Sequence, residues 1–288
     1  MPFNKTEVKR LVSAALIEDA AQKDITTLSF IPQKVYAEAR IIAKERGVVA
    51  GIPIAQEVFK VFDPSVSFGE LKKDGAVVNR GQAIAVIKGK ARSILSCERV
   101  ALNFLSYLSG IASGTHEAVS KVRSKGIRIL DTRKTTPLFR GLEKYAVATG
   151  SGVNHRFDLA GQYLVKDNHL FILRKIKGMD ILADRKRNIP FEIEVDHLSE
   201  LPAVLSLCPD IVMLDNFSPA QVKRAVKIIA KIFPNKNYRP LVELSGGITP
   251  KNISRYAIRG VDFISLGSLT HSAKALDISL EITKVYSR

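Results

Sequence analysis

The spacing of apolar residues predicts two regions of different architecture. Residues 4–20 place apolar side chains at helical intervals, whereas 35–51, 66–78 and 83–91 alternate apolar and polar residues around glycine turns. The first pattern predicts a helix, and the alternating segments are typical of strands in an open sheet. A long helical pattern follows at 93–126 and is interrupted near Gly110 and Gly114. We expect the boundary between the two regions at this interruption.

From Ile127 onward, short apolar segments alternate with helical patterns. The apolar segments occupy 127–132, 163–168, 191–196, 211–216, 241–247 and 263–268. Such continuous apolar runs suit parallel strands that are buried on both faces. Ser218–Pro219 and Thr249–Pro250 each predict a helix start, with the hydroxyl as N-cap and the proline as the first helical residue.

Each predicted strand of this second region ends in a charged, polar or glycine residue. These ends are Arg133–Lys134, Lys166–Asp167, Glu194, Asp215, Ser245–Gly247 and Gly267–Ser268. In a parallel β/α barrel the carboxyl ends of the strands meet at one mouth, where catalytic groups lie. A doubly wound open sheet is the alternative, because it also binds ligands at strand C-termini. Since six segments are evident rather than eight, we expect an incomplete barrel.

The balance of charge predicts an anionic partner. The 288 residues include 44 Lys and Arg against 28 Asp and Glu, which gives a net charge of +16. Basic side chains are concentrated in residues 131–156, at Arg133, Lys134, Arg140, Lys144, His155 and Arg156. Cations repel one another, so such a concentration favours an anion as partner. Nucleic acid is a minor alternative, since the chain has no zinc-finger spacing, RNP-like aromatic string or basic low-complexity tail.

The remaining composition predicts a cytoplasmic protein without a membrane partner. The apolar runs are too short to cross a bilayer, and the N-terminus lacks the apolar core of a signal peptide. Cys97 and Cys208 show no metal or redox spacing. Both are expected to be buried free thiols in a reducing compartment.

Two glycine-containing strand ends predict a phosphate site. SGGITP (245–250) and GSLTHS (267–272) each place small residues before a predicted helix. Free backbone N–H groups and the helix dipole favour an anion at such positions. Each motif alone could be a tight turn, but in consecutive units they favour a phosphate monoester.

Glu194 and Asp215 end neighbouring strands among the cations, and three roles are open to them. They could neutralise Lys166 or Arg133, hold Mg²⁺ through hard oxygen ligands, or accept hydrogen bonds from sugar hydroxyls. The last two roles suit a ribose that carries a pyrophosphate. Arginine suits planar carboxylates and lysine suits phosphates, so a second anionic substrate is expected. Lys166 could instead form a Schiff base as the nucleophile of an aldolase.

Several motifs resemble the signature of the quinolinate phosphoribosyltransferase family, whose activity is also called nicotinate-nucleotide pyrophosphorylase (carboxylating). The signature motifs are DTRKTTP (131–137), LEKYAV (142–147), NHR (154–156) and LVKDNH (164–169). The other motifs, in the family's order, are KDITT (23–27), CERVALNFLSYLSGIA (97–112), FEIEV (191–195), MLDNF (213–217), ELSGGIT (243–249) and GVDFISLGSLTHS (260–272). The resemblance therefore covers essentially the whole chain.

The resemblance implies an α/β fold of two domains. An N-terminal α/β open sandwich is expected at 1–112, with a C-terminal helix at 273–288 as a candidate addition to it. An incomplete, seven-stranded parallel β/α barrel is expected at 113–272. Leu138, Ser151 and Gly161 depart from the family pattern, the first two at positions where glycine is common.

The resemblance also implies a reaction. The family transfers the phosphoribosyl group of phosphoribosyl pyrophosphate to quinolinate and requires Mg²⁺. It releases pyrophosphate and CO2 and forms nicotinate mononucleotide for NAD biosynthesis. A related paralogue, associated with molybdenum transport, shares the fold and many of the motifs. A different acceptor is therefore an alternative.

Site residues follow from the same resemblance, position by position. Arg133, His155 and Arg156 would hold the carboxylates of quinolinate. Arg99 would reach in from a neighbouring subunit, which implies a homodimer or a higher homo-oligomer. The expected catalytic residues, near the substrate anions, the ribose and the metal, are Lys134, Lys166, Glu194 and Asp215, of which the last two would hold Mg²⁺ directly or through water. The expected 5′-phosphate region comprises Ser245, Gly246, Gly247, Gly267, Ser268 and His271.

Overall fold

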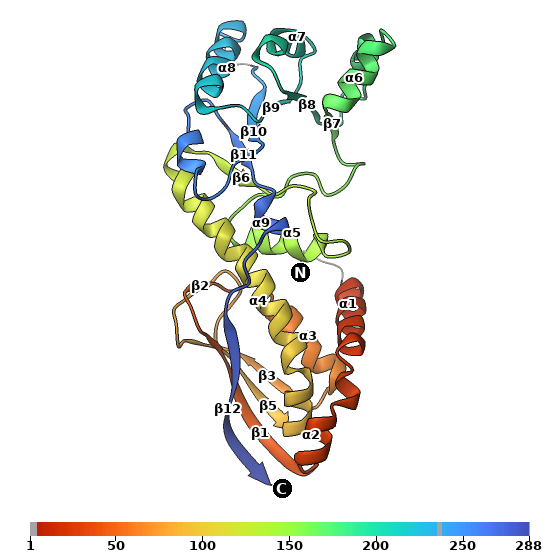
Figure 1. The fold of residues 1–288 in the computed structure, drawn as a ribbon, viewed down its shortest axis with the longest axis vertical. Coiled ribbons are helices and arrows are strands. Elements are labelled where there is room, and N and C mark those ends of the chain that lie inside the picture. The colour runs from red at the N-terminus through yellow and green to blue at the C-terminus, as the bar shows by residue number, and fades with distance from the viewer. Residues whose placement is uncertain (1–4, 235–237, 288) are drawn as a thin grey trace. The chain divides into compact units, whose positions relative to one another are not determined.

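The computed structural model describes residues 5–234 and 238–287, which divide into two compact units (Figure 1). The first unit runs to His116 and also includes Pro137–Ser151 and the C-terminal segment from Ser272. The second unit consists of Glu117–Thr136 and Gly152–His271. The sequence prediction placed Pro137–Ser151 in the second region, whereas these residues pack with the first unit. Each unit has its own sheet.

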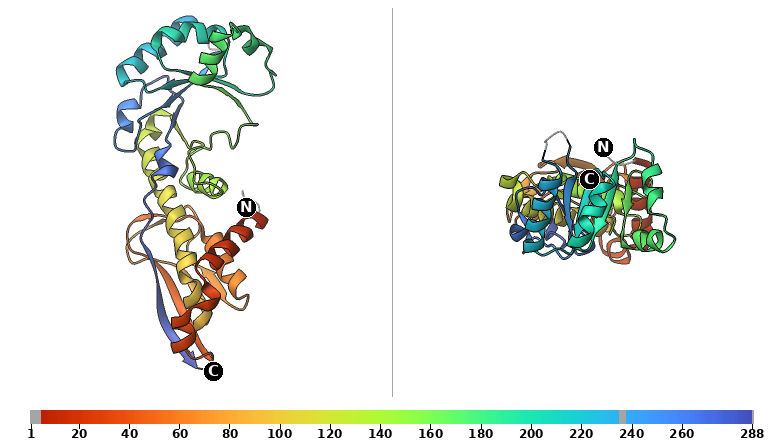
Figure 2. Two further views of the ribbon diagram at one scale, coloured as in Figure 1. Left: turned by 45° about the vertical axis from the view of Figure 1, so that its right-hand side comes forward. Right: turned by 90° about the horizontal axis from the view of Figure 1, so that it is seen from above.

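The sheet of the first unit is built from strands far apart in the sequence. Its order is β12 (Ile278–Ser287), β1 (Val35–Ala43), β5 (Ala83–Lys90) and β3 (Ser67–Glu70), with all neighbours antiparallel. Strands β2 (Gly47–Val48) and β4 (Val77–Val78) form a separate antiparallel pair. Figure 1 and the left view of Figure 2 show α4 (Ala91–Val122) running along one face of the four-stranded sheet.

The predicted C-terminal helix at 273–288 is wrong, because this segment is mainly strand β12. Ile278, Leu280 and Ile282 alternate with polar residues, and this period of two places apolar side chains on one face of a sheet. Pairing with β1 places Ile282 opposite Ala39. Residue 288 lies outside the described residues.

Helices cover the first unit with apolar faces. They are α1 (Lys5–Glu18), η1 (Ala21–Lys23), α2 (Ile25–Phe30), α3 (Ile52–Phe62), α4 and α5 (Arg140–Thr149). Helix α1 packs on α3 and buries Val8, Val12 and Leu16, which recur every four residues. Asp24 begins α2, since its Oδ1 accepts the N–H of Thr27 at 3.0 Å.

The second unit contains a parallel sheet, as the sequence predicted. Among the described residues its order is β6 (Arg128–Leu130), β11 (Phe263–Ser265), β10 (Leu241–Ser245), β9 (Ile211–Asp215), β8 (Phe191–Val195) and β7 (Tyr163–Val165). All neighbouring strands are parallel. Val153 forms one further parallel bridge with Leu130, on the edge of β6 that no strand covers in the described sheet. This arrangement confirms the α/β fold class and brings the carboxyl ends of the strands to one side.

The helices of the second unit connect successive strands. They are η2 (Arg123–Lys125), α6 (Asp167–Lys175), η3 (Met179–Asp184), η4 (Leu198–Glu200), α7 (Leu201–Ser206), α8 (Pro219–Ile232), η5 (Ile253–Tyr256) and α9 (Ser268–His271). Ser218 caps α8 as predicted, and Pro219 is its first residue. The prediction of a helix that starts at Thr249 is wrong. The backbone N–H of Thr249 donates to Asn252 Oδ1 at 2.8 Å in a turn, and only the short η5 follows.

The two cysteines differ in exposure. Cys97 is buried as predicted, but Cys208 is exposed, so that part of the prediction is wrong. Cys208 lies in the turn that follows α7, at a positive φ of 50°. Within the described residues, every helix is too short or too polar to span a membrane.

Two departures from the family pattern occupy left-handed backbone. Leu138 has φ 66° and Ser151 has φ 70°, a region where a residue with a Cβ is strained. Ser151 follows the C-cap residue Gly150 of α5, the position that usually holds glycine in left-handed helix ends. The preference for glycine at these positions therefore has a conformational cause.

Replacing Ser151 with glycine should stabilise the protein. A left-handed residue with a Cβ costs about 1–2 kcal/mol, and the greater freedom of glycine in the unfolded chain offsets about half of it. We expect the free energy of unfolding of Ser151→Gly to exceed that of the wild type by roughly 0.5–1 kcal/mol in urea titrations. Ser151→Ala, which keeps the Cβ, is the matched control. A glycine variant less stable than the alanine variant would contradict this explanation.

Candidate active site

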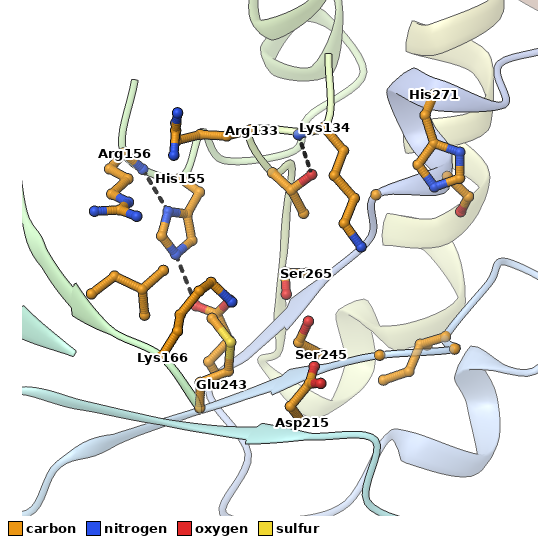
Figure 3. A pocket seen from close by; sticks show the side chains of 18 of the residues that line it. Arg133, Lys134, His155, Arg156, Lys166, Asp215, Glu243, Ser245, Ser265 and His271 are labelled. Atoms are coloured by element: carbon orange, nitrogen blue, oxygen red, sulfur yellow. Dashed lines mark hydrogen bonds and ion pairs between the residues drawn. The ribbon is translucent and has the colours of Figure 1, made fainter. Parts of the chain in front are cut away.

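The carboxyl ends of the parallel strands surround a cavity of about 560 Å³ (Figure 3). This volume lies in the range of small-molecule sites. Most of the predicted site residues line it: Arg133, Lys134, His155, Arg156, Lys166, Asp215, Ser245, Gly246, Gly247, Gly267, Ser268 and His271. The fold therefore brings together side chains that the sequence separates by more than a hundred residues.

The predicted cluster of six basic residues is divided between the two units. Arg133, Lys134, His155 and Arg156 line the cavity, whereas Arg140 and Lys144 belong to α5 in the first unit. Lys144 is buried there.

Arg133 and Arg156 form the most cationic part of the cavity (Figure 3). Both are partly buried, and in the described structure their Nε atoms are shielded from solvent without a hydrogen-bond partner. Burial and the neighbouring charge of Arg133 lower the pKa of Arg156, while the charge of Glu192 raises it. Buried donors without acceptors are costly, so an anion that accepts from them is favoured. The planar guanidinium groups suit carboxylates.

His155 is held by hydrogen bonds on both ring nitrogens. Its Nδ1 accepts the backbone N–H of Arg156 at 2.8 Å, and its Nε2 lies 3.2 Å from Glu192 Oε2 and 3.6 Å from Glu243 Oε2. Because Nδ1 accepts a hydrogen bond, the neutral ring carries its proton on Nε2. The backbone N–H of His155 donates to Asp131 Oδ1 at 2.8 Å. His155 therefore lines the cavity while its nitrogens bind protein groups.

Glu192 and Glu243 lie beneath His155, and neither was predicted as a site residue. Both are fully buried, on strands β8 and β10, which lie on either side of β9. Burial and the charge of Glu192 raise the pKa of Glu243 well above its usual value. The signal was visible in FEIEV and LVELS, where Glu192 and Glu243 each stand between two apolar residues. Such residues face the interior and need a partner or a proton.

Lys166 forms an ion pair with Glu194, so one of the three predicted roles of Glu194 is observed. Glu194 is buried and does not line the cavity. Burial raises its pKa, and Lys166 partly offsets this effect. Because Lys166 Nζ is engaged by this carboxylate, the geometry does not single it out as a Schiff-base nucleophile.

A second acidic group fits a hard metal ion. Ligand oxygens of Glu194, Asp196 and Asp215 all lie within 4.8 Å of one another. Asp196 was missed because it lies one residue past the end of β8, and burial followed by the charge of Asp215 raises its pKa. Carboxylate oxygens are the ligands that Mg²⁺ prefers. The donor set therefore fits Mg²⁺.

The glycine-containing strand ends are closely packed. Gly246 has φ +82°, and a Cβ there would collide with the side chain of Asn216. Asn216 donates its backbone N–H to the carbonyl of Ser245 at 3.0 Å, and its side chain donates to Asp215 at 2.5 Å. The glycine thus lets the β9 and β10 ends approach each other, which brings Asp215 beside the small-residue loop.

The segment that follows β11 packs against the segment that follows β6. Thr270 Oγ1 donates to the carbonyl of Lys134 at 2.7 Å. A Cβ on Gly267 would lie 3.1–3.2 Å from atoms of His271 and Lys134, so glycine permits this packing. Ser268 Oγ is buried and has no hydrogen-bond partner among the described residues. Lys134, His271 and this free hydroxyl suit the oxygens of a phosphate.

Besides Glu194, Arg99 is the other predicted site residue that this chain does not bring to the cavity lining. It is exposed on α4 in the first unit.

Known proteins resemble this chain over nearly its whole length. Residues 24–109 match the N-terminal domain of quinolinate phosphoribosyl transferase, and residues 111–281 match its C-terminal domain. The probable nicotinate-nucleotide pyrophosphorylase [carboxylating] of Methanocaldococcus jannaschii is 41% identical over 96% of this chain and 97% of its own. Its counterpart from Bacillus subtilis is 40% identical over 98% and 95%. The solved nicotinate-nucleotide pyrophosphorylase of Francisella tularensis is 37% identical, with a TM-score of 0.87 and 98% of each chain covered.

The buried carboxyl of Glu243 should make stability fall as pH rises. Its raised pKa means that the folded protein keeps a proton which the unfolded chain releases above the ordinary pKa of glutamate. The free energy of unfolding therefore decreases as the pH rises from the ordinary pKa of glutamate to the raised pKa of Glu243. Glu243→Gln mimics the protonated carboxyl, so its stability relative to the wild type should increase from about pH 5 to about pH 8 in urea titrations.

Glu117→Gln, at an exposed ion pair on α4, is the matched control for this measurement. It removes one carboxylate without touching the buried pair. A constant difference between Glu243→Gln and the wild type across this pH range would show that Glu243 is not protonated in the folded protein.

Proposed function

The chain belongs to the quinolinate phosphoribosyltransferase family, and on this premise we propose how its cavity carries out the family's reaction. The enzyme transfers the phosphoribosyl group of phosphoribosyl pyrophosphate to quinolinate and forms nicotinate mononucleotide, pyrophosphate and CO2 in NAD biosynthesis. The observation that supports this function most directly is the pair of buried, unpartnered Nε atoms of Arg133 and Arg156. Two adjacent guanidinium groups match the two neighbouring carboxylates of quinolinate.

The cavity orients two anions that would otherwise repel each other. Arg133 and Arg156 bind quinolinate, while Lys134, His271 and Ser268 bind the phosphate end of the sugar. Asp215 and Ser245 lie between these groups, where the ribose would be (Figure 3). Fixing both reactants in one orientation removes much of the entropic barrier to their reaction.

Bond formation and cleavage at the sugar need no protein nucleophile. The lone pair of the pyridine nitrogen forms the bond to C1′ as the C1′–O bond to pyrophosphate breaks, and the electron pair leaves with pyrophosphate. Positive charge that develops on the ribose is stabilised by the carboxylate of Asp215, with Glu194 close to it. Lys166, ion-paired with Glu194, lies beside the same carboxylates and faces the cavity.

Decarboxylation follows from the new charge on the ring. Once bonded to C1′, the pyridine nitrogen is cationic, so it stabilises the electron pair that remains on the ring carbon when CO2 departs. A proton from solvent completes nicotinate mononucleotide. The protein's part is to hold the departing carboxylate in the arginine pocket and away from bulk water.

Glu194, Asp196 and Asp215 would hold the Mg²⁺ ion. When bound, Mg²⁺ would neutralise charge on the pyrophosphate and so stabilise it as a leaving group. Glu194 would contribute ligand oxygens while it retains Lys166 as its cationic partner.

The active form is proposed to be a homodimer or a larger homo-oligomer. Arg99 is exposed on α4, and an exposed arginine can complete the anion site of a second copy. A cytoplasmic location is proposed as well, since the exposed free thiol of Cys208 suits a reducing compartment.

The direct test is product formation by the purified protein. CO2 and nicotinate mononucleotide should form in equal amounts, and only when quinolinate, phosphoribosyl pyrophosphate and Mg²⁺ are all present. Chelation of the metal should abolish turnover, and added Mg²⁺ should restore it. Absence of both products under these conditions would overturn the proposed function, as would phosphoribosyl transfer to a different acceptor without CO2 release.

Mixed dimers would test the role of Arg99. Arg99→Ala and Lys166→Ala should each be nearly inactive alone. When the two are refolded together, a heterodimer holds one site with both defects and one intact site. Recovery of up to about a quarter of wild-type activity is expected under random pairing. If mixed dimers form and no activity returns, Arg99 acts within its own subunit or has no role in the site.

A further inference from the structure

Four residues beside the cavity form a closed ring of hydrogen bonds. Gln162 Nε2 donates to Glu192 Oε2 at 2.7 Å, and Glu192 Oε2 lies 3.2 Å from His155 Nε2. His155 Nδ1 accepts the N–H of Arg156 at 2.8 Å. The Nη1 of Arg156 donates to the backbone carbonyl of Gln162 at 2.9 Å, which closes the ring.

The ring fixes both ends of Arg156. One bond holds its backbone and another holds its guanidinium group, so the orientation of its remaining donors is set. The side chains of His155 and Glu192 are 8% and 0% exposed, so water competes little for these bonds. Hydrogen bonds shielded from water are stronger than exposed ones, and they reinforce one another in a closed network.

The chain between Arg156 and Gln162 is shaped to close the ring. Asp158 Oδ1 accepts the N–H groups of Ala160 and Gly161 at 2.9 and 3.2 Å, which turns the loop back on itself. Gln162 is consequently returned to the side of Arg156, although it does not line the cavity.

We propose that Gln162 is a positioning residue for quinolinate binding, acting on Arg156 through Glu192 and His155. This inference rests on the proposed function of the same cavity. The carboxylate of Glu192 already has the acidic Glu243 as a neighbour, and Gln162 provides it with a neutral hydrogen-bond donor. An acidic side chain here would repel Glu192, and an apolar one would leave its oxygen dependent on His155 alone. Either change leaves Glu192 less firmly held and so loosens its hold on the His155 ring, which accepts the backbone N–H of Arg156.

The test separates the two substrates. Gln162→Met keeps the length of the side chain and removes the donor, and Gln162→Ala serves as a second variant if the first folds poorly. For each, KM for quinolinate should rise roughly tenfold, as expected for a lost hydrogen bond to a charged group. KM for phosphoribosyl pyrophosphate should stay within about twofold of the wild type, because the phosphate-binding groups are outside the ring.

Gln221→Met is the matched control, since Gln221 also makes a side-chain hydrogen bond but in the capping box of α8. It should lower thermal stability and change neither KM. Equal increases of both KM values in the Gln162 variants would show a merely structural role and would overturn the inference. Wild-type turnover of quinolinate, measured first, decides the proposed function independently of this result.

A double-mutant cycle tests whether Gln162 acts through Arg156. In the Arg156→Ala background, Gln162→Met should raise KM for quinolinate by less than about twofold further, because the residue it positions is absent. Full additivity of the two effects would contradict the inference. In the substrate-free protein, ¹⁵N NMR should show the Nε2–H tautomer of His155 in the wild type and a mixture of ring forms in Gln162→Met. An unchanged His155 tautomer in Gln162→Met would show that Gln162 does not act on Arg156 through Glu192 and His155.

Discussion

The site depends on burying acids beneath closely spaced cations. Arg133 and Arg156 repel each other in the cavity wall, and Arg133 lowers the pKa of Arg156 accordingly. Glu192, which is buried and hydrogen-bonded to His155, opposes this effect, as does Asp158. Because Glu243 resists ionisation, the buried pair favours a single negative charge. The arginine side chains therefore keep a net positive charge that binds anions, and the buried carboxylate reduces their repulsion in the absence of substrate.

The parallel sheet explains why these groups can meet. Glu192 and Glu243 lie on strands that flank β9, two residues before Glu194, next to the end of β8, and Ser245, the end of β10. Side chains two apart on a strand share a face, so the buried acids and the functional ends point to the same interior. Glu192 and Glu243 lie close to His155, and Glu243 and Ser245 also line the cavity.

The sequence predicted the strand ends well because continuous apolar runs are a strong local signal. It also predicted which ends carry the cations and small residues that line the cavity. The buried Glu192 and Glu243 were not predicted as site residues: their positions between apolar residues indicate that they face the interior, but their partners depend on packing between strands far apart in the sequence. The sequence prediction was wrong at the C-terminus, where the alternation of Ile278, Leu280 and Ile282 is too short to decide without β1 as partner. The helix start predicted at Thr249 was also wrong, because the N–H of Thr249 donates to the side chain of Asn252 and the chain forms a turn there.

The central claim is that the paired arginines recognise two carboxylates on one ring. Calorimetric titration of the purified protein with quinolinate and with nicotinate, which lacks one carboxylate, tests this claim most directly. The account predicts that quinolinate binds at least roughly tenfold more tightly, since a buried charged partner left unpaired costs at least about 2 kcal/mol. Equal affinity for the two compounds, in protein whose fold is verified, would contradict it.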